Sequence, residues 1–142
     1  MRIYVASSWR NKYQPEVCQQ LVRWGHQVFD FRHPRPGYDG FHWREIDADW
    51  QEWKPDALRA VLQDNPKAAC GFLSDLRGMQ WADACVLVLP CGRSAHLEAG
   101  WFAGTGKRLI VYMPEKQEPD LMYLLAQDIV LTDEELFKSL RV

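Results

Sequence analysis

The chain has 142 residues, of which 47% are hydrophobic and 25% are charged. This length and composition fit one globular domain with its own core and exclude a disordered chain. The formal net charge is -2 and no basic run stands out, so we expect no nucleic-acid partner. No apolar run approaches the ~20 residues of a membrane-spanning helix, so no membrane partner is expected either.

The first half of the chain alternates between strand and helix patterns. The predicted elements are a strand over 3–6, a helix over 15–24 with Pro15 in its first turn, a strand over 27–31, and a loop over 32–41 that holds prolines and glycines. A helical pattern interrupted at Pro55 follows over 43–63, and a short helix over 66–72 comes next.

The second half continues the alternation. Ser74-Asp75 is typical of a cap and predicts a helix to about residue 82, followed by a strand over 85–89 that Pro90 ends. The sequence then predicts a tight turn, a helix opened by Ser94 and running to about 104, a strand over 108–113, a helix over 119–127, a strand over 129–131, and a last helix capped by Thr132 with capping-box spacing.

Strands that alternate with helices predict an α/β fold in which a parallel sheet has helices on both faces. We expect a flavodoxin-like or Rossmann-like sheet of five strands in the order 2-1-3-4-5. The sequence shows no repeat, linker or low-complexity segment, so residues 1–142 are predicted to form one domain.

The cysteines stand apart from one another, and the histidines lack metal-ligand spacing. We therefore expect neither a metal nor another cofactor. The sequence enters its first strand at once, without a signal-peptide pattern, so a reducing cytoplasm with free thiols is the expected location.

Ligands of such folds bind at the carboxyl ends of the strands, near the switch point between strands 1 and 3. The turn after strand 1 carries Ser8 and Arg10, and the turn after strand 3 carries Gly92 and Ser94. A strand, a glycine turn and a helix start form a favourable anion site. Arg93, in the same turn, is expected to be a solvated surface charge.

Glu98 is predicted in the first turn of the helix opened by Ser94, where the helix dipole would keep its carboxylate ionised and able to act as a nucleophile. Asp75, at the expected start of its own helix, lies at the same sheet edge, either as a second catalytic carboxylate or as a simple N-cap. Asp83 precedes strand 3 and is expected at the opposite edge, in a structural role. Tyr4 lies in a buried strand, and Glu98 is a reasonable partner for its hydroxyl.

Aromatic residues are concentrated in one segment that contains Trp43, Trp50 and Trp53. For Trp43 the sequence leaves two interpretations open, core packing and the wall of a pocket for a flat ligand such as a nucleobase. For Trp50 and Trp53 packing is favoured.

Several ordered motifs resemble the nucleoside 2-deoxyribosyltransferase family, which includes the nucleoside 5′-monophosphate N-glycosidases. They are Ile3-Tyr4-Val5-Ala6-Ser7-Ser8-Trp9-Arg10, Asp75 before a helix, Ala82-Asp83-Ala84, Gly92-Arg-Ser94, His96-Leu-Glu98-Ala-Gly100 and Met122-Tyr123-Leu124. They are spread over nearly the whole chain.

The resemblance implies cleavage of an N-glycosidic bond without a metal. It makes Glu98 the nucleophile at C1′, Asp75 the group that assists the departing base, and Tyr4 the group that orients Glu98. It places Ser8, Arg10 and Ser94 at the 5′ end of the substrate. It also implies a homodimer, in which Met122 and Tyr123 reach into the neighbouring subunit's site.

The expected partner is therefore a small-molecule nucleotide or nucleoside. Arg10 beside Ser8 favours a phosphate, and hence hydrolysis of a nucleoside 5′-monophosphate. Two alternatives remain open: a deoxyribosyltransferase that exchanges nucleobases, and a nucleotide-binding module without catalysis.

Overall fold

The computed structural model describes residues 1–141 and contains a five-stranded, all-parallel sheet in the order β2-β1-β3-β4-β5. This is the predicted order, and the chain has an α/β flavodoxin-like fold. The strands agree with the sequence prediction apart from their terminal residues. They are β1 (Arg2–Ala6), β2 (Gln27–Asp30), β3 (Ala84–Val88), β4 (Arg108–Tyr112) and β5 (Asp128–Val130).

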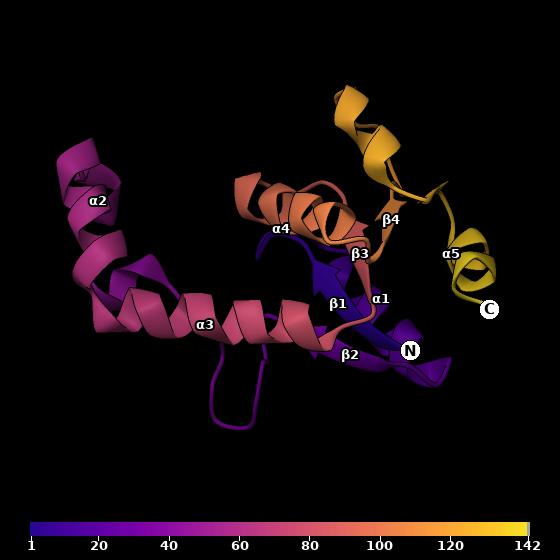
Figure 1. Cartoon of the computed structure of the whole chain (residues 1–142), viewed down its shortest axis with the longest axis horizontal. Helices are drawn as coiled ribbons and strands as arrows, with labels where there is room; N and C mark the ends of the chain where they lie inside the picture. The colour runs from indigo at the N-terminus through magenta and orange to yellow at the C-terminus, as the bar shows by residue number, and fades with distance from the viewer. Residues whose placement is uncertain (142) are drawn as a thin grey trace.

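Helices cover both faces of the sheet, and alternate strand residues point to opposite faces (Figure 1). Ile3 and Val5 pack with α1 (Gln14–Arg23) and α5 (Asp133–Leu140). On the other face, Tyr4 and Ala6 pack with α3 (Pro66–Trp81) and α4 (Arg93–Gly104). The central strands are therefore buried on both sides, as their apolar sequences require.

The segment from Pro66 to Trp81 is one continuous helix, so the prediction of a new helix capped by Ser74-Asp75 was wrong. The cap is Asn65, whose side-chain oxygen accepts hydrogen bonds from the N–H groups of Lys67 at 2.9 Å and Ala68 at 3.2 Å. Asp75 consequently lies inside a helix and caps nothing.

Two glycines inside α3 bring this helix close to neighbouring aromatic rings. A Cβ atom added to Gly71 would lie 2.8 Å from Phe41, and one added to Gly78 would lie 2.7 Å from Phe29. Any larger side chain would push these rings away. The glycines therefore serve the packing of α3 against β2 and the loop before residue 43.

The segment from 43 to 63 holds two 3₁₀ turns, η1 (Trp43–Glu45) and η2 (Trp50–Glu52), before α2 (Pro55–Asp64). The Asp47 side chain explains the irregular part, because it accepts hydrogen bonds from the Asp49 N–H and the Trp53 indole N–H, both at 2.8 Å. The helix predicted over 119–127 is likewise a 3₁₀ segment, η3 (Leu121–Leu125).

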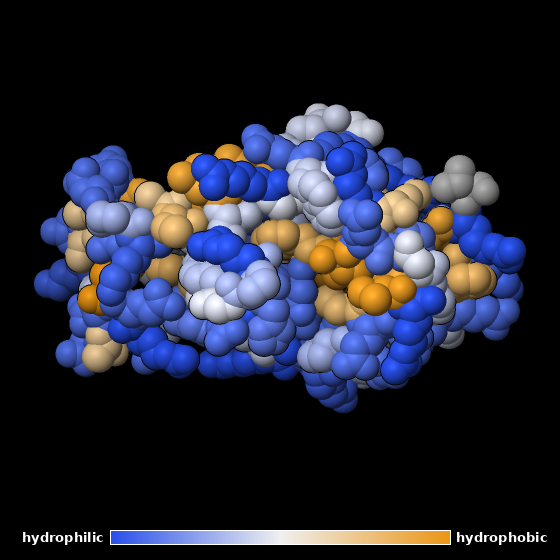
Figure 2. Space-filling model, turned by 90° about the horizontal axis from the view of Figure 1, so that it is seen from below, coloured by the Kyte–Doolittle hydropathy of each residue, from blue (hydrophilic) through white to orange (hydrophobic). Residues whose placement is uncertain are grey.

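The far end of the molecule is formed by α2 and the first part of α3, which extend beyond the sheet (Figure 1). No side chain of α2 is buried, and Leu62 is 60% exposed. Figure 2 shows hydrophobic surface interleaved with hydrophilic surface at this end. Among residues 1–141, no helix combines the length and the apolar character needed to cross a membrane.

Candidate active site

An open cavity of about 490 Å³ lies at the carboxyl ends of β1 and β3. This is the sheet edge that the switch-point rule predicts. Its walls come from the turns after these two strands, the start of α4, the middle of α3 and the loop around η1. The lining residues are Ser7, Ser8, Trp9, Phe31, Phe41, His42, Trp43, Arg44, Trp50, Asp75, Gly92, Arg93, Ser94, Ala95 and Glu98.

The two turns are tied to each other by hydrogen bonds. The Gly92 N–H donates to the Ser8 hydroxyl at 2.7 Å, and the Ser7 hydroxyl donates to the Val88 carbonyl at 2.8 Å. The Asn11 side chain adds a bond to the Pro90 carbonyl at 3.0 Å. Ser8 and Gly92 therefore lie together, as the sequence prediction required.

The start of α4 opens onto this cavity. Gly92 is the N-cap, so the helix begins at Arg93, and Ser94 does not cap it as predicted. The N–H groups of residues 93–95 have no acceptor among residues 1–141, as expected for the first turn of a helix. Arg93, expected to be an ordinary surface charge, lines the cavity together with Arg44. This end of the cavity is suited to an anion.

Glu98 lies in the second turn of α4, one turn later than predicted. Its carboxylate accepts a hydrogen bond from the Tyr4 hydroxyl. Tyr4 has no exposed surface and stacks on Phe29 with ring centroids 5.1 Å apart. The predicted Tyr4–Glu98 contact is therefore present, and Tyr4 can hold only one position.

The expectation that the helix dipole keeps Glu98 ionised was wrong. The pKa of Glu98 is raised to about 7, because burial raises it more than the Tyr4 hydrogen bond lowers it, and the nearby Asp75 adds a smaller rise. Burial also raises the pKa of Asp75 to about 6. The two carboxyl groups therefore titrate near neutral pH, as is common in active sites.

Asp75 reaches the cavity from the middle of α3 rather than from a helix start. No group among residues 1–141 donates a hydrogen bond to its carboxyl oxygens, whereas Glu98 receives one from Tyr4. A hydrogen bond to a carboxylate stabilises the ionised form. Burial outweighs this hydrogen bond, because the pKa of Glu98, at about 7, still lies above that of Asp75, at about 6.

Aromatic side chains form another wall of the cavity. The rings of Trp9 and His42 lie 4.6 Å apart, and Phe41 meets Trp43 edge to face at 4.8 Å. Trp43 and Trp50 line the cavity, whereas the Trp53 ring packs on the edge of Trp43. Sequence reasoning noted this aromatic segment but identified neither His42 nor Arg44, which carry no motif of their own.

Three residues predicted for the site lie elsewhere in this chain. Arg10 lines an adjoining cavity that shares Ser8, and Met122 is 61% exposed. The Tyr123 hydroxyl lies 3.0 Å from Nε2 of His96 and lines a separate hollow. The structure thus brings Tyr4, Ser8, Trp43, Asp75, Gly92, Ser94 and Glu98 together, but not these three.

Asp83 lies at the opposite sheet edge, as predicted, where its carboxylate pairs with Arg2 at 2.7 Å. Within residues 1–141, no cluster of three or more His, Cys, Asp or Glu side chains could hold a metal ion. Burial raises the pKa of the Cys91 thiol near the turn to about 12, so this thiol is neutral at physiological pH.

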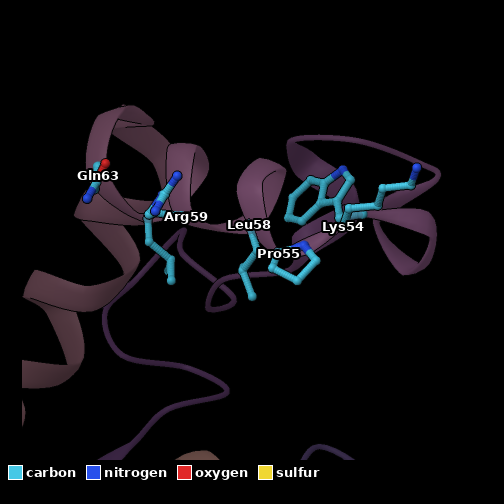
Figure 3. A pocket seen from close by; sticks show the side chains of 7 residues that line it. Lys54, Pro55, Leu58, Arg59 and Gln63 are labelled. Carbon is cyan, nitrogen blue, oxygen red and sulfur yellow. The ribbon is translucent and has the colours of Figure 1, made fainter.

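A second hollow of about 440 Å³ lies on α2 (Figure 3). Its apolar part is formed by Trp53, Pro55, Leu58 and Leu62, and Lys54, Arg59 and Gln63 complete the lining. No carboxyl group, hydroxyl group or thiol lines it. The chemistry of the cavity that holds Glu98 is therefore not repeated here.

No protein-family model and no curated protein matches the sequence. Solved structures do match over nearly the whole chain. A 2-deoxyribosyltransferase from Bacillus psychrosaccharolyticus has 20% identity and a TM-score of 0.63, with 96% of this chain and 90% of that chain covered. A conserved protein from Enterococcus faecalis V583 has 12% identity and a TM-score of 0.59, with 96% and 94% covered.

A CMP N-glycosidase from Clostridium botulinum matches with 16% identity and a TM-score of 0.53 over 100% of both chains. At these identities the likeness establishes a shared fold. Two of the three neighbours are enzymes, one a deoxyribosyltransferase and one an N-glycosidase. The fold therefore supports the resemblance to the nucleoside 2-deoxyribosyltransferase family that the sequence motifs carry.

Proposed function

We propose that this chain is an enzyme of the nucleoside 2-deoxyribosyltransferase family that hydrolyses the N-glycosidic bond of a nucleoside or deoxynucleoside 5′-monophosphate. The observation that carries the proposal is the pair formed by Glu98 and Asp75. Both carboxyl groups are largely withdrawn from water, and only Glu98 receives the Tyr4 hydrogen bond. The Tyr4 hydroxyl orients Glu98 and stabilises its ionised form, so we assign Glu98 as the nucleophile and Asp75 as the acid, and the reactive form is the one that carries its single proton on Asp75.

In the first step, Glu98 attacks C1′ of the sugar with its ionised carboxylate. A bond forms between a Glu98 oxygen and C1′, and the bond from C1′ to the base nitrogen breaks. The electron pair of that bond leaves with the base. Asp75 supplies a proton to the departing base, which therefore leaves as a neutral molecule.

In the second step, water attacks C1′ and Asp75 accepts its proton. The bond between Glu98 and C1′ breaks. The Glu98 carboxylate is then free again and accepts its hydrogen bond from Tyr4. If a second nucleobase takes the place of water, the same intermediate gives base exchange. Base exchange is the alternative function, because the chain shares its fold with a 2-deoxyribosyltransferase.

The rest of the cavity fits the two ends of a nucleotide. The aromatic wall with Trp43 provides a flat apolar surface for stacking a base. The turn with Ser8 and the turn with Gly92 and Ser94, together with Arg93, provide donors and positive charge for a phosphate. A volume of about 490 Å³ lies within the range of small-ligand sites.

The test is incubation with a panel of nucleoside monophosphates and the matching nucleosides, with free base measured by chromatography. We expect base release from at least one monophosphate and none from the Glu98→Ala variant. A second nucleobase in the mixture distinguishes exchange from hydrolysis. Tight binding of a ligand that stays intact would support the binding module instead, and equal activity of Glu98→Ala would rule out the proposed chemistry.

We also propose a homodimer in which Met122 and Tyr123 act in the partner's cavity. This proposal rests on the family resemblance and on their position outside the cavity of their own chain. A mixture of the Glu98→Gln and Tyr123→Ala variants should regain activity if subunits exchange, because some mixed dimers would contain one intact site. A monomer in light scattering would contradict it.

A further inference from the structure

We infer that Arg32 is a positioning residue that shapes the turn after β1 into an anion-binding surface. Nη2 of Arg32 donates hydrogen bonds to three main-chain carbonyl oxygens, those of Ser8 at 2.9 Å, Trp9 at 2.8 Å and Asn11 at 2.9 Å. One guanidinium nitrogen thus binds most of the main-chain carbonyl groups of this turn. The identification of the anion as a phosphate rests on the proposed function.

Peptide geometry links these carbonyl groups to the opposite side of the turn. The peptide bonds here are trans, and in a planar trans peptide the C=O and the following N–H point in opposite directions. The N–H groups of Trp9, Arg10 and Lys12 therefore point away from Arg32. None of the three has an acceptor among residues 1–141. The N–H of Asn11, between them, donates to the Ser8 carbonyl at 3.0 Å, so the consecutive free N–H groups are those of Trp9 and Arg10, with that of Lys12 beside them. Free main-chain N–H groups gathered in a turn can bind an anion.

Arg32 is itself held in place. Its N–H donates to Oδ1 of Asp30 at 2.9 Å, and the same oxygen accepts a bond from the Gln14 side chain at 2.8 Å. The guanidinium group lies 5.6 Å from the centre of the Trp9 ring and 5.8 Å from that of Phe31. Both rings line the cavity that holds Glu98. The cation is therefore fixed between the turn and the aromatic wall.

This arrangement gives the main chain of Arg10 a role. Arg10 and Lys12 line the adjoining cavity, which shares Ser8 with the cavity of Glu98. The free N–H groups lie in the same turn as Ser8, whose hydroxyl accepts the Gly92 N–H. A phosphate beside Ser8 could then meet donors from both turns, and Arg32 would hold those of the first turn in place.

The test measures binding of inorganic phosphate by amide chemical shifts in two-dimensional NMR. In the wild type, phosphate should shift the amide signals of Trp9, Arg10 and Lys12. In Arg32→Met and Arg32→Gln, which lack the guanidinium group, the dissociation constant for phosphate should rise about tenfold or more. Arg35→Met is the matched control, because Arg35 lies in the same loop and its side chain stacks on Tyr38, away from the turn after β1.

Base release gives the second readout. The KM for the monophosphate should rise with the phosphate dissociation constant while kcat changes little, because a positioning role affects binding of the 5′ end. Wild-type phosphate affinity in a folded Arg32 variant would overturn the inference. So would failure of both variants to fold, which would make Arg32 a general structural residue.

The inference and the proposed function can fail separately. Unshifted Trp9, Arg10 and Lys12 amides in the wild type would overturn the role of Arg32, even if base is released from nucleosides. Phosphate binding that depends on Arg32, without base release from any substrate, would leave the inference standing and contradict the proposed chemistry.

Discussion

The Tyr4 hydroxyl on β1 donates a hydrogen bond to Oε2 of Glu98 on α4, so a strand in the core of the sheet fixes the carboxyl group of a cavity wall. Tyr4 is fully buried between the rings of Phe29 and Phe102. Its hydroxyl cannot turn to another partner without disturbing the core. The geometry of Glu98 is therefore set by the sheet.

Tyr4→Phe should lower kcat for base release by about 10- to 100-fold. The ionised carboxylate of Glu98, which is the nucleophile, would lose the hydrogen bond that it accepts from the Tyr4 hydroxyl. That bond lowers the pKa of Glu98, so its loss raises this pKa and moves the acidic limb of the pH profile to higher pH. Steady-state rates between pH 5 and 9 measure both effects. An unchanged acidic limb would show that Tyr4 does not act through Glu98.

Glu98→Gln should remove activity and stabilise the fold at alkaline pH. Burial raises the pKa of Glu98 from 4.5 to about 7, so the folded chain binds this proton more tightly than the unfolded chain. Stability is therefore lost as pH rises from about 4.5 through 7, when a buried carboxylate must ionise. The variant should gain about 1–3 kcal/mol of unfolding free energy at pH 8.

Urea denaturation at pH 8 and at pH 4.5 checks this prediction. The gain should shrink to a small value at the lower pH, where Glu98 of the wild type carries its proton in the folded state and about half of the time in the unfolded state. A variant that is less stable than the wild type at pH 8 would contradict the assigned environment of Glu98.

The wild-type rate should follow a bell-shaped pH profile, with its maximum between about 6 and 7, where the carboxyl pair holds one proton. Asp75→Asn should lower the rate by about 10²- to 10⁴-fold and abolish the alkaline limb, since no acid remains to deprotonate. The acidic limb should move to lower pH, because Asp75 raises the pKa of Glu98.

Asp83→Asn is the matched control for Asp75→Asn. The Asp83 carboxylate bonds to Arg2 at the other sheet edge, and this bond lowers its pKa to about 2. The exposed pair contributes little to stability. Wild-type activity and an unchanged pH profile are expected. An equal loss in both variants would mean that the effect of Asp75→Asn comes from misfolding.

Lys107→Met should destabilise the fold by about 1–3 kcal/mol. Nζ of Lys107 donates to the carbonyl oxygens of Met79 at 3.0 Å, Gln80 at 2.8 Å and Ala82 at 2.7 Å, at the end of α3. Its loss leaves these carbonyl groups without their cation. Thermal unfolding measures the loss of stability. Lys138→Met, the same substitution at an exposed lysine of α5, is the control.

The fold could be predicted because each signal was local. Apolar runs mark the strands, and the alternation with helices leads to the observed strand order. The helix boundaries were harder to predict. Ser74-Asp75 has the composition of an N-cap, but no residue near it ends the helix that begins at Pro66. Gly71 and Gly78 let α3 pack closely against the rings of Phe41 and Phe29, which are distant in the chain, and local sequence does not reveal these contacts.

The candidate site likewise has features that the sequence predicts and features that depend on the whole fold. Glu98, Asp75 and Tyr4 were found from motif order and sheet geometry, and the structure places them together. The protonation state of Glu98 was misjudged, because burial depends on the whole fold while dipole effects were argued from spacing. Arg32 escaped notice because its role depends on three carbonyl groups more than twenty positions away.

The helix α2 divides the molecule into regions of unequal cooperativity. It buries no side chain, and a helix of 10 residues is short for independent stability in water. Its amide hydrogens should therefore exchange with solvent through local opening, at a free energy well below that of β1 and β3. Hydrogen exchange would then be slow in the sheet and rapid in α2. Ligand binding at the Glu98 cavity would slow exchange in the sheet far more than in α2.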